Sequence, residues 1–405
     1  MKKWIIFLLP ALLFACRNEN VITTFSVANP SSFERANELA EVSLDALPPL
    51  PEEGLFVLLD ANNANIPYQV TYDGKLIFPV AVPAHGEAAY TLKAGVAGKY
   101  APLVYGRHYP ERKDDIAWEN DRIAFRTYGP ALQATGEKSY GYDIWVKCVP
   151  EFVAESWYAK ELDPEVRAQI EELKKTDRAA AQALSDAISY HIDHGTGMDA
   201  YNVGPTLGAG TSAFLVDGAI VYPYCYHTYE ILENGPLRFT AKLAYHPLAV
   251  GEDSNVIETR VISLDAGSQL NRVTISFENL SRPTPLVTGI VLHETSDNYH
   301  IDPADGFMAY TDSIDAQNGQ IFVGVVCPSE LDEAKAVYFT ESEKKERKAS
   351  GHILSANLYA PASAYTYYTG GGWSKWGFRD TGDWVGYLAE FSRKIKEPLV
   401  ITCHK

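Results

Sequence analysis

The chain has 405 residues and a formal net charge of −17, from 52 acidic and 35 basic side chains. This balance argues against nucleic acid or an acidic membrane surface as a partner, because both are polyanions. The 25 tyrosines and 7 tryptophans, with only 21% charged residues, indicate a folded chain with aromatic-lined surfaces. An acidic ligand would need a local pocket of positive charge.

The first residues have the pattern of a bacterial lipoprotein signal. Two lysines precede an apolar run over residues 4–13, which is too short to span a bilayer permanently. Cys16 directly follows the small Ala15, so residues 1–16 are predicted to be the signal peptide and the lipidated cysteine. Lipids on Cys16 would anchor the protein in the cell envelope, at the outer membrane on its periplasmic or surface face. The alternative is an ordinary secretory signal with a chance cysteine.

Residues 21–98 are predicted to form a small β-sandwich of their own. Short apolar alternations recur along this segment, and Tyr72-Asp73-Gly74-Lys75 is a strong hairpin signal. The proline-rich residues 47–51 are expected to form a loop within it.

The four remaining cysteines are far apart in the sequence and form no Cys-x-x-Cys pair. This spacing disfavours zinc ribbons and redox motifs. Disulfides and buried free thiols both remain open for Cys148, Cys225, Cys327 and Cys403.

Residues 104–160 carry charged and aromatic side chains on predicted strands. Arg122 and Arg126 share one strand face, and Asp143, Trp145 and Lys147 share another. Such charges are usually solvated or paired. With aromatic residues between them they also suit recognition of a sugar carboxylate, so both interpretations stay open.

A short helical excursion follows. Asp163 suits a helix cap and Pro164 the first turn of a helix that runs to Lys175, and residues 178–188 are predicted to be helical after a break. The excursion leads into residues 190–210, called here the His-Gly loop.

The His-Gly loop holds ionisable groups on a backbone that glycines bend sharply. Its candidate catalytic residues are His191, Asp193, His194 and Tyr201. A His/His or His/carboxylate pair suits an acid–base couple or a divalent cation. The spacing shows no third ligand, so no cofactor is firm and a divalent cation stays an alternative. Such loops also often bond only their own backbone.

From residue 213 to the end the pattern is almost wholly strands, which favours a large antiparallel sandwich. Near the end, Trp373, Trp376 and Trp384 lie close to a triple glycine. Tryptophans in such a segment suit a platform that stacks on a sugar. The alternative is a hydrophobic plug that closes the sandwich.

Four ordered blocks, residues 118–126, 143–147, 190–195 and 204–210, resemble the signature blocks of a known family. It is the Bacteroidota lipoprotein family catalogued as domain of unknown function 4861. The resemblance implies a galactose-mutarotase-like β-supersandwich over residues 104–405, and a setting among genes for degrading pectin and other uronate polysaccharides. It implies no established reaction. The fold prediction is therefore mainly β, with a small N-terminal sandwich, a large antiparallel supersandwich and a short helical excursion.

The function predicted first is a polysaccharide lyase that acts on an acidic oligo- or polysaccharide by β-elimination. Arg122, Arg126 or Lys147 would neutralise the uronate carboxylate, and a histidine or tyrosine of the His-Gly loop would transfer protons. The His-Gly loop, the arginine strand and the Trp373–Trp384 segment are expected to share one cleft.

Three alternatives remain. A glycoside hydrolase would need two carboxylates flanking a bond, and a mutarotase-like epimerase would need a histidine and a glutamate. A binding lipoprotein would use the tryptophans alone. The candidate hydrolase carboxylates are Asp143, Asp193, Asp199 and Glu294, and the candidate epimerase residues are His227, His293 and Glu294.

Overall fold

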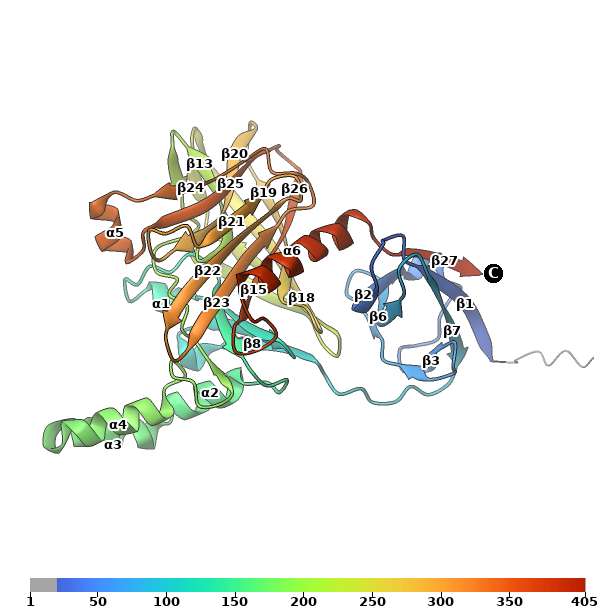
Figure 1. Cartoon of the computed structure of the whole chain (residues 1–405), viewed down its shortest axis with the longest axis horizontal. Coiled ribbons are helices and arrows are strands. Elements are labelled where there is room, and N and C mark those ends of the chain that lie inside the picture. The colour runs from blue at the N-terminus through green and yellow to red at the C-terminus, as the bar shows by residue number, and fades with distance from the viewer. Residues whose placement is uncertain (1–19, 405) are drawn as a thin grey trace, which may run out of the picture.

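The computed structural model describes residues 20–404 and consists of two β-rich units (Figure 1). Residues 1–16, with the predicted signal and Cys16, lie outside the described residues. Within residues 20–404, no helix is long and apolar enough to cross a membrane. The four cysteines of this part of the chain are free thiols.

The N-terminal unit is a small sandwich of two antiparallel sheets around a core that includes Phe25, Phe78 and Leu92. One sheet has the order β27-β1-β7-β3-β4 and the other the order β2-β6-β5. The strands are β1 (Val21–Ala28), β2 (Arg35–Ser43), β3 (Phe56–Asp60), β4 (Asn65–Ile66), β5 (Gln69–Val70), β6 (Lys75–Val82), β7 (Glu87–Ala94) and β27 (Val400–His404).

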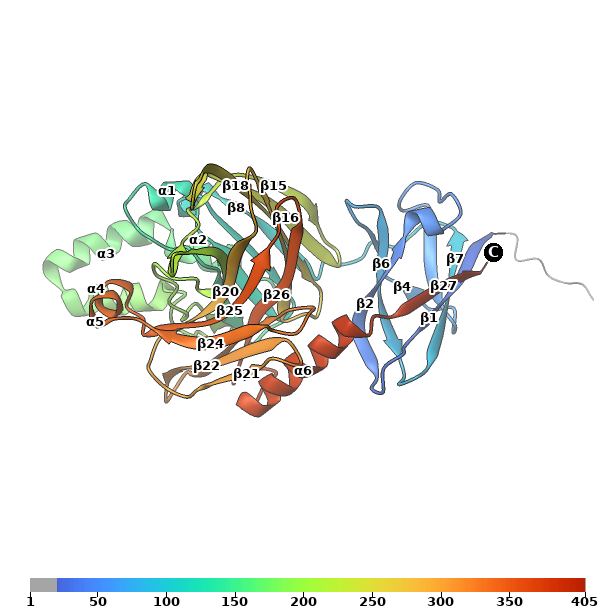
Figure 2. The ribbon, with the colours of Figure 1, turned by 90° about the horizontal axis from the view of Figure 1, so that it is seen from above.

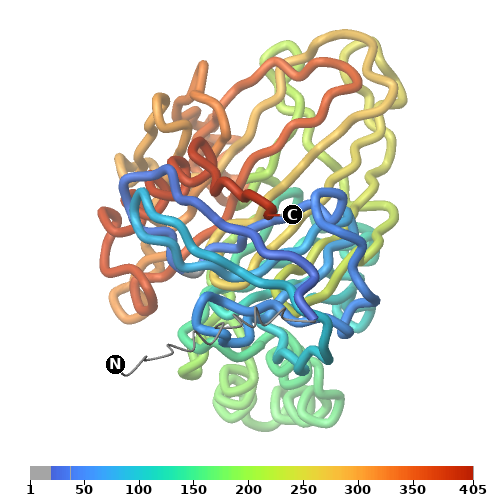
Figure 3. Tube along the Cα trace, turned by 90° about the vertical axis from the view of Figure 1, so that its right-hand side faces the viewer, coloured from blue at the N-terminus to red at the C-terminus, as the bar shows by residue number. Residues whose placement is uncertain are grey.

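The last strand of the chain corrects one predicted boundary. Residues 400–404 were expected in the second unit, but β27 pairs antiparallel with β1, with Phe25 opposite Cys403. Figure 3 shows the C-terminus among the strands of the N-terminal unit. Strand alternation alone does not show which sheet a terminal strand joins, because pairing partners are set by tertiary contact.

The large unit is built on a long antiparallel sheet, β15-β16-β18-β19-β26-β23-β22-β21, with β17 paired to β18. A second sheet, β14-β13-β20-β25-β24, shares its core. The strands of the first are β15 (Tyr226–Asn234), β16 (Arg238–Tyr245), β17 (Leu248–Val250), β18 (Asp253–Asp265), β19 (Leu270–Glu278), β21 (Tyr299–Asp302), β22 (Phe307–Asp315), β23 (Gly319–Val326) and β26 (Ala364–Trp373). Those of the second are β13 (Ala209–Val216), β14 (Ala219–Val221), β20 (Thr284–Leu292), β24 (Glu333–Tyr338) and β25 (Gly351–Tyr359).

A further sheet, β12-β11-β10-β9-β8, positions the candidate site. Its strands are β8 (Val104–Tyr109), β9 (Asp115–Asn120), β10 (Ile123–Thr127), β11 (Asp143–Lys147) and β12 (Gly197–Met198). Because side chains alternate along a strand, one face sends Trp118, Phe125 and Ile144 into the main core. The other face packs Ala124 and Trp145 against Trp157 of α2, and is called here the helix-covered face.

The helical excursion is confirmed. Helix α3 (Pro164–Thr176) is capped by Asp163, whose side chain accepts hydrogen bonds from two backbone N–H groups of the first turn, and α4 (Arg178–Ile188) is capped in the same way by Asp177. The preceding α2 (Ala154–Glu161) was not predicted. The α3–α4 pair projects away from the sheets (Figure 1). The remaining helices are α1 (Pro130–Gln133), α5 (Glu341–Arg347), α6 (Thr381–Lys396) and the short turns η1 (Leu44–Ala46) and η2 (Pro110–Arg112).

Helix α6 joins the two units. It packs Trp384 and Leu388 against Phe322 of the long sheet, and from its end the chain continues into β27 of the small sandwich (Figure 2). The helix therefore returns the chain from the large unit to the small one.

Candidate functional site

A cavity of about 660 Å³ lies beside the His-Gly loop and is called here the His191 cavity. Its walls come from the η2 turn, β10, the segment after α1, the His-Gly loop and the end of α5. The charged residues of its lining are Arg112, Arg126, Glu137, Lys138, His191, Asp199, Glu346, Arg347 and Lys348.

A buried ionic cluster forms the base of this cavity. Alternation along β9, β10 and β11 brings Asp115, Arg126 and Asp143 to the helix-covered face. Arg126 Nη2 donates to a carboxylate oxygen of Asp143 and, at 2.8 Å, to Oδ2 of Asp199. All of these side chains are buried, so the arginine neutralises carboxylates that would otherwise be very costly to bury.

Burial raises the pKa of two carboxyl groups in the cluster. The pKa of Asp115 rises to about 6 because burial outweighs the attraction of Arg126 and Arg112. Burial and the neighbouring Asp143 also raise the pKa of Asp199 above its usual range. Raised carboxyl pKa values beside a cavity are typical of functional sites, although structural ion pairs produce them too.

The hydroxyl of Tyr190 lies between two guanidinium groups. It accepts hydrogen bonds from Arg126 Nη1 at 3.2 Å and from Arg112 Nη2 at 3.2 Å. Burial raises the pKa of Tyr190, so its proton stays on the oxygen at neutral pH. The aromatic ring packs against Trp145 and Trp157, which fixes the start of the His-Gly loop.

Arg112 is the functional candidate that the sequence analysis missed. It is half-buried and lines the cavity, yet within residues 20–404 it has no carboxylate within 4.0 Å. Its segment, Glu111-Arg112-Lys113-Asp114, reads as an ordinary solvated turn, and only the fold brings it against Tyr190. Arg347 and Lys348 of the lining likewise have no carboxylate within 4.0 Å in the described part of the chain.

His191 lies at the cavity wall with its side chain 54% exposed. Its Nδ1 is 2.9 Å from the backbone oxygen of Asp199 and 3.5 Å from Oδ2 of the same residue. A carbonyl oxygen can only accept, so Nδ1 carries the proton of the neutral ring. That arrangement leaves Nε2 as a free base.

The other predicted catalytic residues have mainly structural contacts. His194 Nε2 bonds the backbone oxygen of Ser189 at 3.1 Å. Asp193 accepts from the N–H groups of Gly195 and Gly197 and pairs with Lys375 at 3.2 Å. Burial would raise the pKa of Asp193, but these contacts outweigh it and lower the pKa. Neither residue is part of the cavity lining.

Tyr201 does line the cavity, but it is buried and its hydroxyl donates to the backbone oxygen of Gly208 at 3.4 Å. Its ring meets that of His293 edge-on at 5.1 Å. His293 Nδ1 lies 2.7 Å from Asp312 Oδ2, and Nε2 lies 2.6 Å from the backbone oxygen of Asn202. Both ring nitrogens of His293 therefore have hydrogen-bond partners, so neither is available for the proton transfer that an epimerase needs.

Several predicted substrate-binding residues are buried, and this corrects those predictions. Trp145, Trp373 and Trp384 are 0–1% exposed and fill the cores of the large unit. Lys147 is buried with Glu119 at 2.8 Å, and Glu119 also accepts from the N–H groups at the start of α2. These side chains cannot reach a glycan, because the tryptophans are packed in the core and Lys147 is paired with Glu119. Strand alternation alone does not show this packing or pairing.

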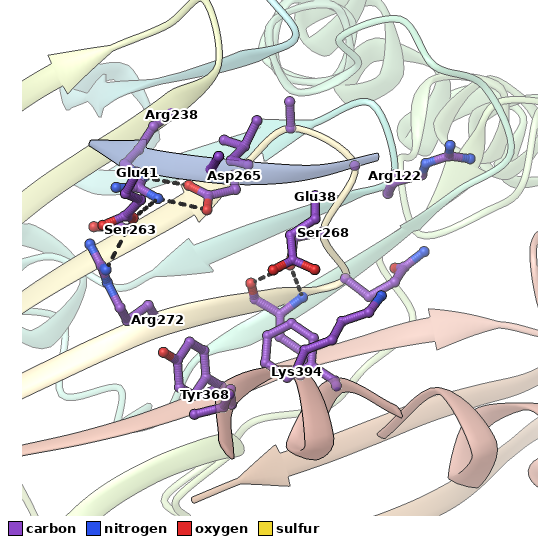
Figure 4. Close-up of a pocket in the computed structure, with 18 of the residues that line it drawn as sticks. Glu38, Glu41, Arg122, Arg238, Ser263, Asp265, Ser268, Arg272, Tyr368 and Lys394 are labelled. Atoms are coloured by element: carbon purple, nitrogen blue, oxygen red, sulfur yellow. Dashed lines mark hydrogen bonds and ion pairs between the residues drawn. The ribbon is translucent and has the colours of Figure 1, made fainter. Parts of the chain in front are cut away.

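The predicted single cleft is also corrected. Arg122 lies just before β10 and does not line the His191 cavity; its guanidinium lies 5.9 Å from the ring centre of the half-buried Trp376. Arg122 lines a different cavity, which lies between the two units and is called here the inter-unit cavity (Figure 4). Arg122 and Arg126 thus lie near opposite ends of β10 and line different cavities.

The four carboxylates considered for a hydrolase do not all line the His191 cavity, and of the four only Asp143 and Asp199 come together, at Arg126. Of the four, Asp199 lines it, whereas Asp143 is buried beneath and Glu294 accepts from Asn298 at 2.9 Å. Among the described residues, no group of three or more histidine, cysteine, aspartate or glutamate side chains is arranged to hold a metal ion.

The protein is mainly β, with a sandwich-type large unit. The His191 cavity is polar and rich in cations. The chain belongs to the family described as domain of unknown function DUF4861, which matches residues 27–401. The protein called "Uncharacterized protein P7" from Formosa agariphila is 30% identical over 306 residues, which are 74% of this chain and 69% of that protein.

Two solved structures from Enterococcus faecalis are similar at 10% identity. One is a protein in glycosyl hydrolase family 38, with a TM-score of 0.48 over 96% of this chain and 48% of that chain. The other is an alpha-mannosidase, with a TM-score of 0.49 over 95% of this chain and 46% of that chain. The chain spans about half the length of both. Similarity at this level carries no argument about activity.

Proposed function

We propose that the protein is an enzyme that acts on an acidic glycan in the His191 cavity, by β-elimination at a uronate residue. One observation carries the proposal: a histidine with a free Nε2 shares a cavity with Arg112, Arg347 and Lys348, none of which has a carboxylate partner within 4.0 Å among residues 20–404. Cations without a carboxylate partner, beside a base, suit an anionic substrate. The genomic setting implied by the family resemblance agrees with this substrate class.

The chemistry follows from these positions. Arg112 would bind the uronate carboxylate, which makes the C5 proton more acidic. His191 Nε2 would take that proton, the C5–H electron pair would form the C4=C5 double bond, and the C4–O4 bond would break. The leaving oxygen would take a proton from the imidazolium or from water. In its ionised form Asp199 would stabilise the imidazolium, since its Oδ2 lies 3.5 Å from Nδ1.

The test compares two neighbouring histidines. His191→Ala should lower kcat on pectic or other uronate oligosaccharides by a factor of about 10²–10⁴, with affinity changed only a few-fold. His194→Ala is the matched control, because its ring faces the Ser189 carbonyl outside the cavity. The unsaturated product is followed by ultraviolet absorbance and mass spectrometry.

The outcomes separate the candidate functions. Equal activity of both variants and the wild type would remove His191 from the mechanism. Products with new reducing ends and no unsaturation would indicate hydrolysis, and binding without any product would indicate a binding lipoprotein.

We also propose that the protein is anchored in the cell envelope through lipids on Cys16, as the sequence of residues 1–16 predicts. The test is detergent partitioning of the wild type against Cys16→Ser. The anchored form should enter the detergent phase and the variant should not. Equal partitioning of both forms would contradict the proposal.

A further inference from the structure

Two tyrosine–histidine pairs meet at the edge of the long sheet, where β15 is the first strand. Tyr226 on β15 lies opposite Tyr245 on β16 in the antiparallel ladder, and both tyrosines are buried in the main core. Because successive side chains along a strand point to opposite faces, the histidine after each tyrosine turns outward. His227 is exposed and His246 is half-buried. The ladder therefore brings two imidazole rings to the same outer surface.

A β-bulge brings these two rings together. The register shifts between Tyr226 and Thr228, so His227 is the extra residue and has no partner on β16. A bulge of this kind redirects a side chain, and diagonal neighbours on two strands lie within reach of aromatic side chains. The ring centres of His227 and His246 are 4.3 Å apart, with the ring planes inclined by 44°.

The nitrogens of this histidine pair have no other partner. Within residues 20–404, no hydrogen bond or ion pair involves a ring nitrogen of His227 or His246. By contrast, His191 and His293 each use at least one ring nitrogen on a nearby oxygen. A neutral imidazole keeps a lone pair on one nitrogen, and that nitrogen is a common ligand of transition metals. The pair thus offers two unengaged nitrogen donors.

The separation of the rings matches that of two adjacent ligands on one metal ion. A metal–nitrogen bond of about 2.0–2.1 Å places an imidazole ring centre about 3.1–3.2 Å from the metal. Ring centres at the observed 4.3 Å would then subtend an angle of about 85–90° at the ion. Tetrahedral coordination would instead need ring centres about 5.1 Å apart. Rotation of an imidazole about its Cβ–Cγ bond turns the nitrogens and leaves the ring centre nearly in place.

Angles near 90° narrow the choice of metal. Square-planar and tetragonal sites with nitrogen ligands suit Cu(II) and Ni(II), whereas Zn(II) prefers a tetrahedral site. Between the first two, Cu(II) binds nitrogen ligands more tightly.

We propose that His227 and His246 form a surface site for a divalent copper ion. The two histidines take adjacent positions around the ion, and water fills the others. In the described part of the chain, no group of three or more histidine, cysteine or carboxylate side chains is arranged to hold a metal, so this site is a two-ligand chelate that stays open to solvent. It lies outside the His191 cavity and does not depend on the function proposed there.

The test titrates Cu(II) into the untagged protein by calorimetry, with glycine as a weak competing chelator. Accessible thiols are alkylated first in every sample, because thiols also bind copper. His227→Ala and His246→Ala should each weaken Cu(II) binding at least tenfold, because the loss of either ring breaks the chelate. His300→Ala is the matched control, since His300 is an exposed strand histidine whose ring neighbours Phe307 and no second histidine among the described residues.

Electron paramagnetic resonance of the bound Cu(II) identifies the ligands. The wild type and His300→Ala should show one copper ion with two nitrogen ligands, and each single variant of the pair should lose this signal. Ni(II) should bind more weakly than Cu(II).

Three outcomes would overturn the inference. One is wild-type affinity at half the stoichiometry in each single variant, since the two histidines would then bind copper separately. Another is an equal loss of affinity in His300→Ala. The third is tighter binding of Zn(II) than of Cu(II), which would contradict the coordination angle.

Discussion

The two cavities of this protein are nearly equal in volume, at about 660 and 670 Å³, and both contain several arginine and lysine side chains. They differ in how those cations are paired. In the inter-unit cavity each cation has a carboxylate within 4.0 Å. In the His191 cavity Arg112, Arg347 and Lys348 have none among residues 20–404. A count of charges in the lining would miss this difference. Cations without a carboxylate partner favour an anionic ligand, whereas paired cations do not.

The largest expected effect concerns Arg126, which lies under the His191 cavity. Arg126→Gln leaves Asp143 and Asp199 buried without their counter-charge, so unfolding free energy should fall by about 3–5 kcal/mol. Urea denaturation measures it. Arg122→Gln is the control at the inter-unit cavity, where the side chain is 44% exposed, and should change stability by less than about 0.5 kcal/mol. Equal losses in the two variants would show that Arg126 is not the main counter-charge.

Arg112 should distinguish the cavities by ligand affinity. Arg112→Gln removes a guanidinium that has no carboxylate partner and should weaken binding of an acidic oligosaccharide by about 10- to 100-fold, as expected for a charge-assisted hydrogen bond of about 1.5–3 kcal/mol. Titration calorimetry at fixed salt measures it. Arg272→Gln, which changes a paired cation of the other cavity, should leave this affinity unchanged. The comparison of the cavities fails if the two variants lose affinity equally.

His293, which contacts the backbone oxygen of the cavity residue Asn202, should give the stability of the fold a pH dependence. Both ring nitrogens face acceptors, Asp312 and the backbone oxygen of Asn202. Burial lowers the pKa, but these contacts, with Glu294 nearby, outweigh it and raise the pKa. A raised histidine pKa stabilises the fold fully below the unfolded value of about 6.5, and the contribution is lost as pH rises through the folded value.

His293→Gln should therefore cost about 2 kcal/mol near pH 5.5 and clearly less near pH 8.5, by denaturant titration at both. Asp312→Asn removes the partner and should show the same trend. The raised pKa values of Asp115 and Asp199 also act on stability with pH, but they are common to all these proteins and cancel in the difference. A cost that does not depend on pH would contradict the doubly protonated ring.

The smallest effect is expected at Glu41 of the inter-unit cavity. Burial would raise its pKa, but Arg238 and Arg272 outweigh it and lower the pKa to about 2. A lowered carboxyl pKa stabilises the fold above the unfolded value of about 4.5, and the contribution is lost as pH falls toward 2. Glu41→Gln should cost about 1 kcal/mol at neutral pH, and the difference from wild type should shrink between about pH 4.5 and 3. An unchanged difference over that interval would mean that the pairs do not join the two units energetically.

The local features of the fold could be read from the sequence. The caps of α3 and α4 depend on Asp163 and Asp177, which bond the next few backbone N–H groups, so their signal lies within a few residues. The same holds for the Asp73-Gly74 hairpin turn, whose Gly74 has a φ of 77°. Strand alternation correctly placed Asp143, Trp145 and Lys147 on one face.

Alternation could not show what covers that face. Trp145 and Lys147 were candidates for sugar binding, but α2 packs over them and Glu119 neutralises the lysine. Trp384 is a core residue because α6 packs it against the long sheet, and Trp373 is one because β26 turns it into the main core of the large unit. In each case the deciding partner lies on another helix or strand.

By itself, the sequence determined the mainly β architecture and the helical excursion, because short-range periodicity and capping encode them. Only the tertiary structure decided that β27 pairs with β1 in the N-terminal unit and that Arg122 and Arg126 line different cavities. It also decided that Arg112 donates a hydrogen bond to Tyr190, 78 positions further along the chain. It also distinguished His191 from His194. The physical reason is that pairing and burial depend on which distant side chains approach, and those approaches fix which charges remain free to bind a ligand.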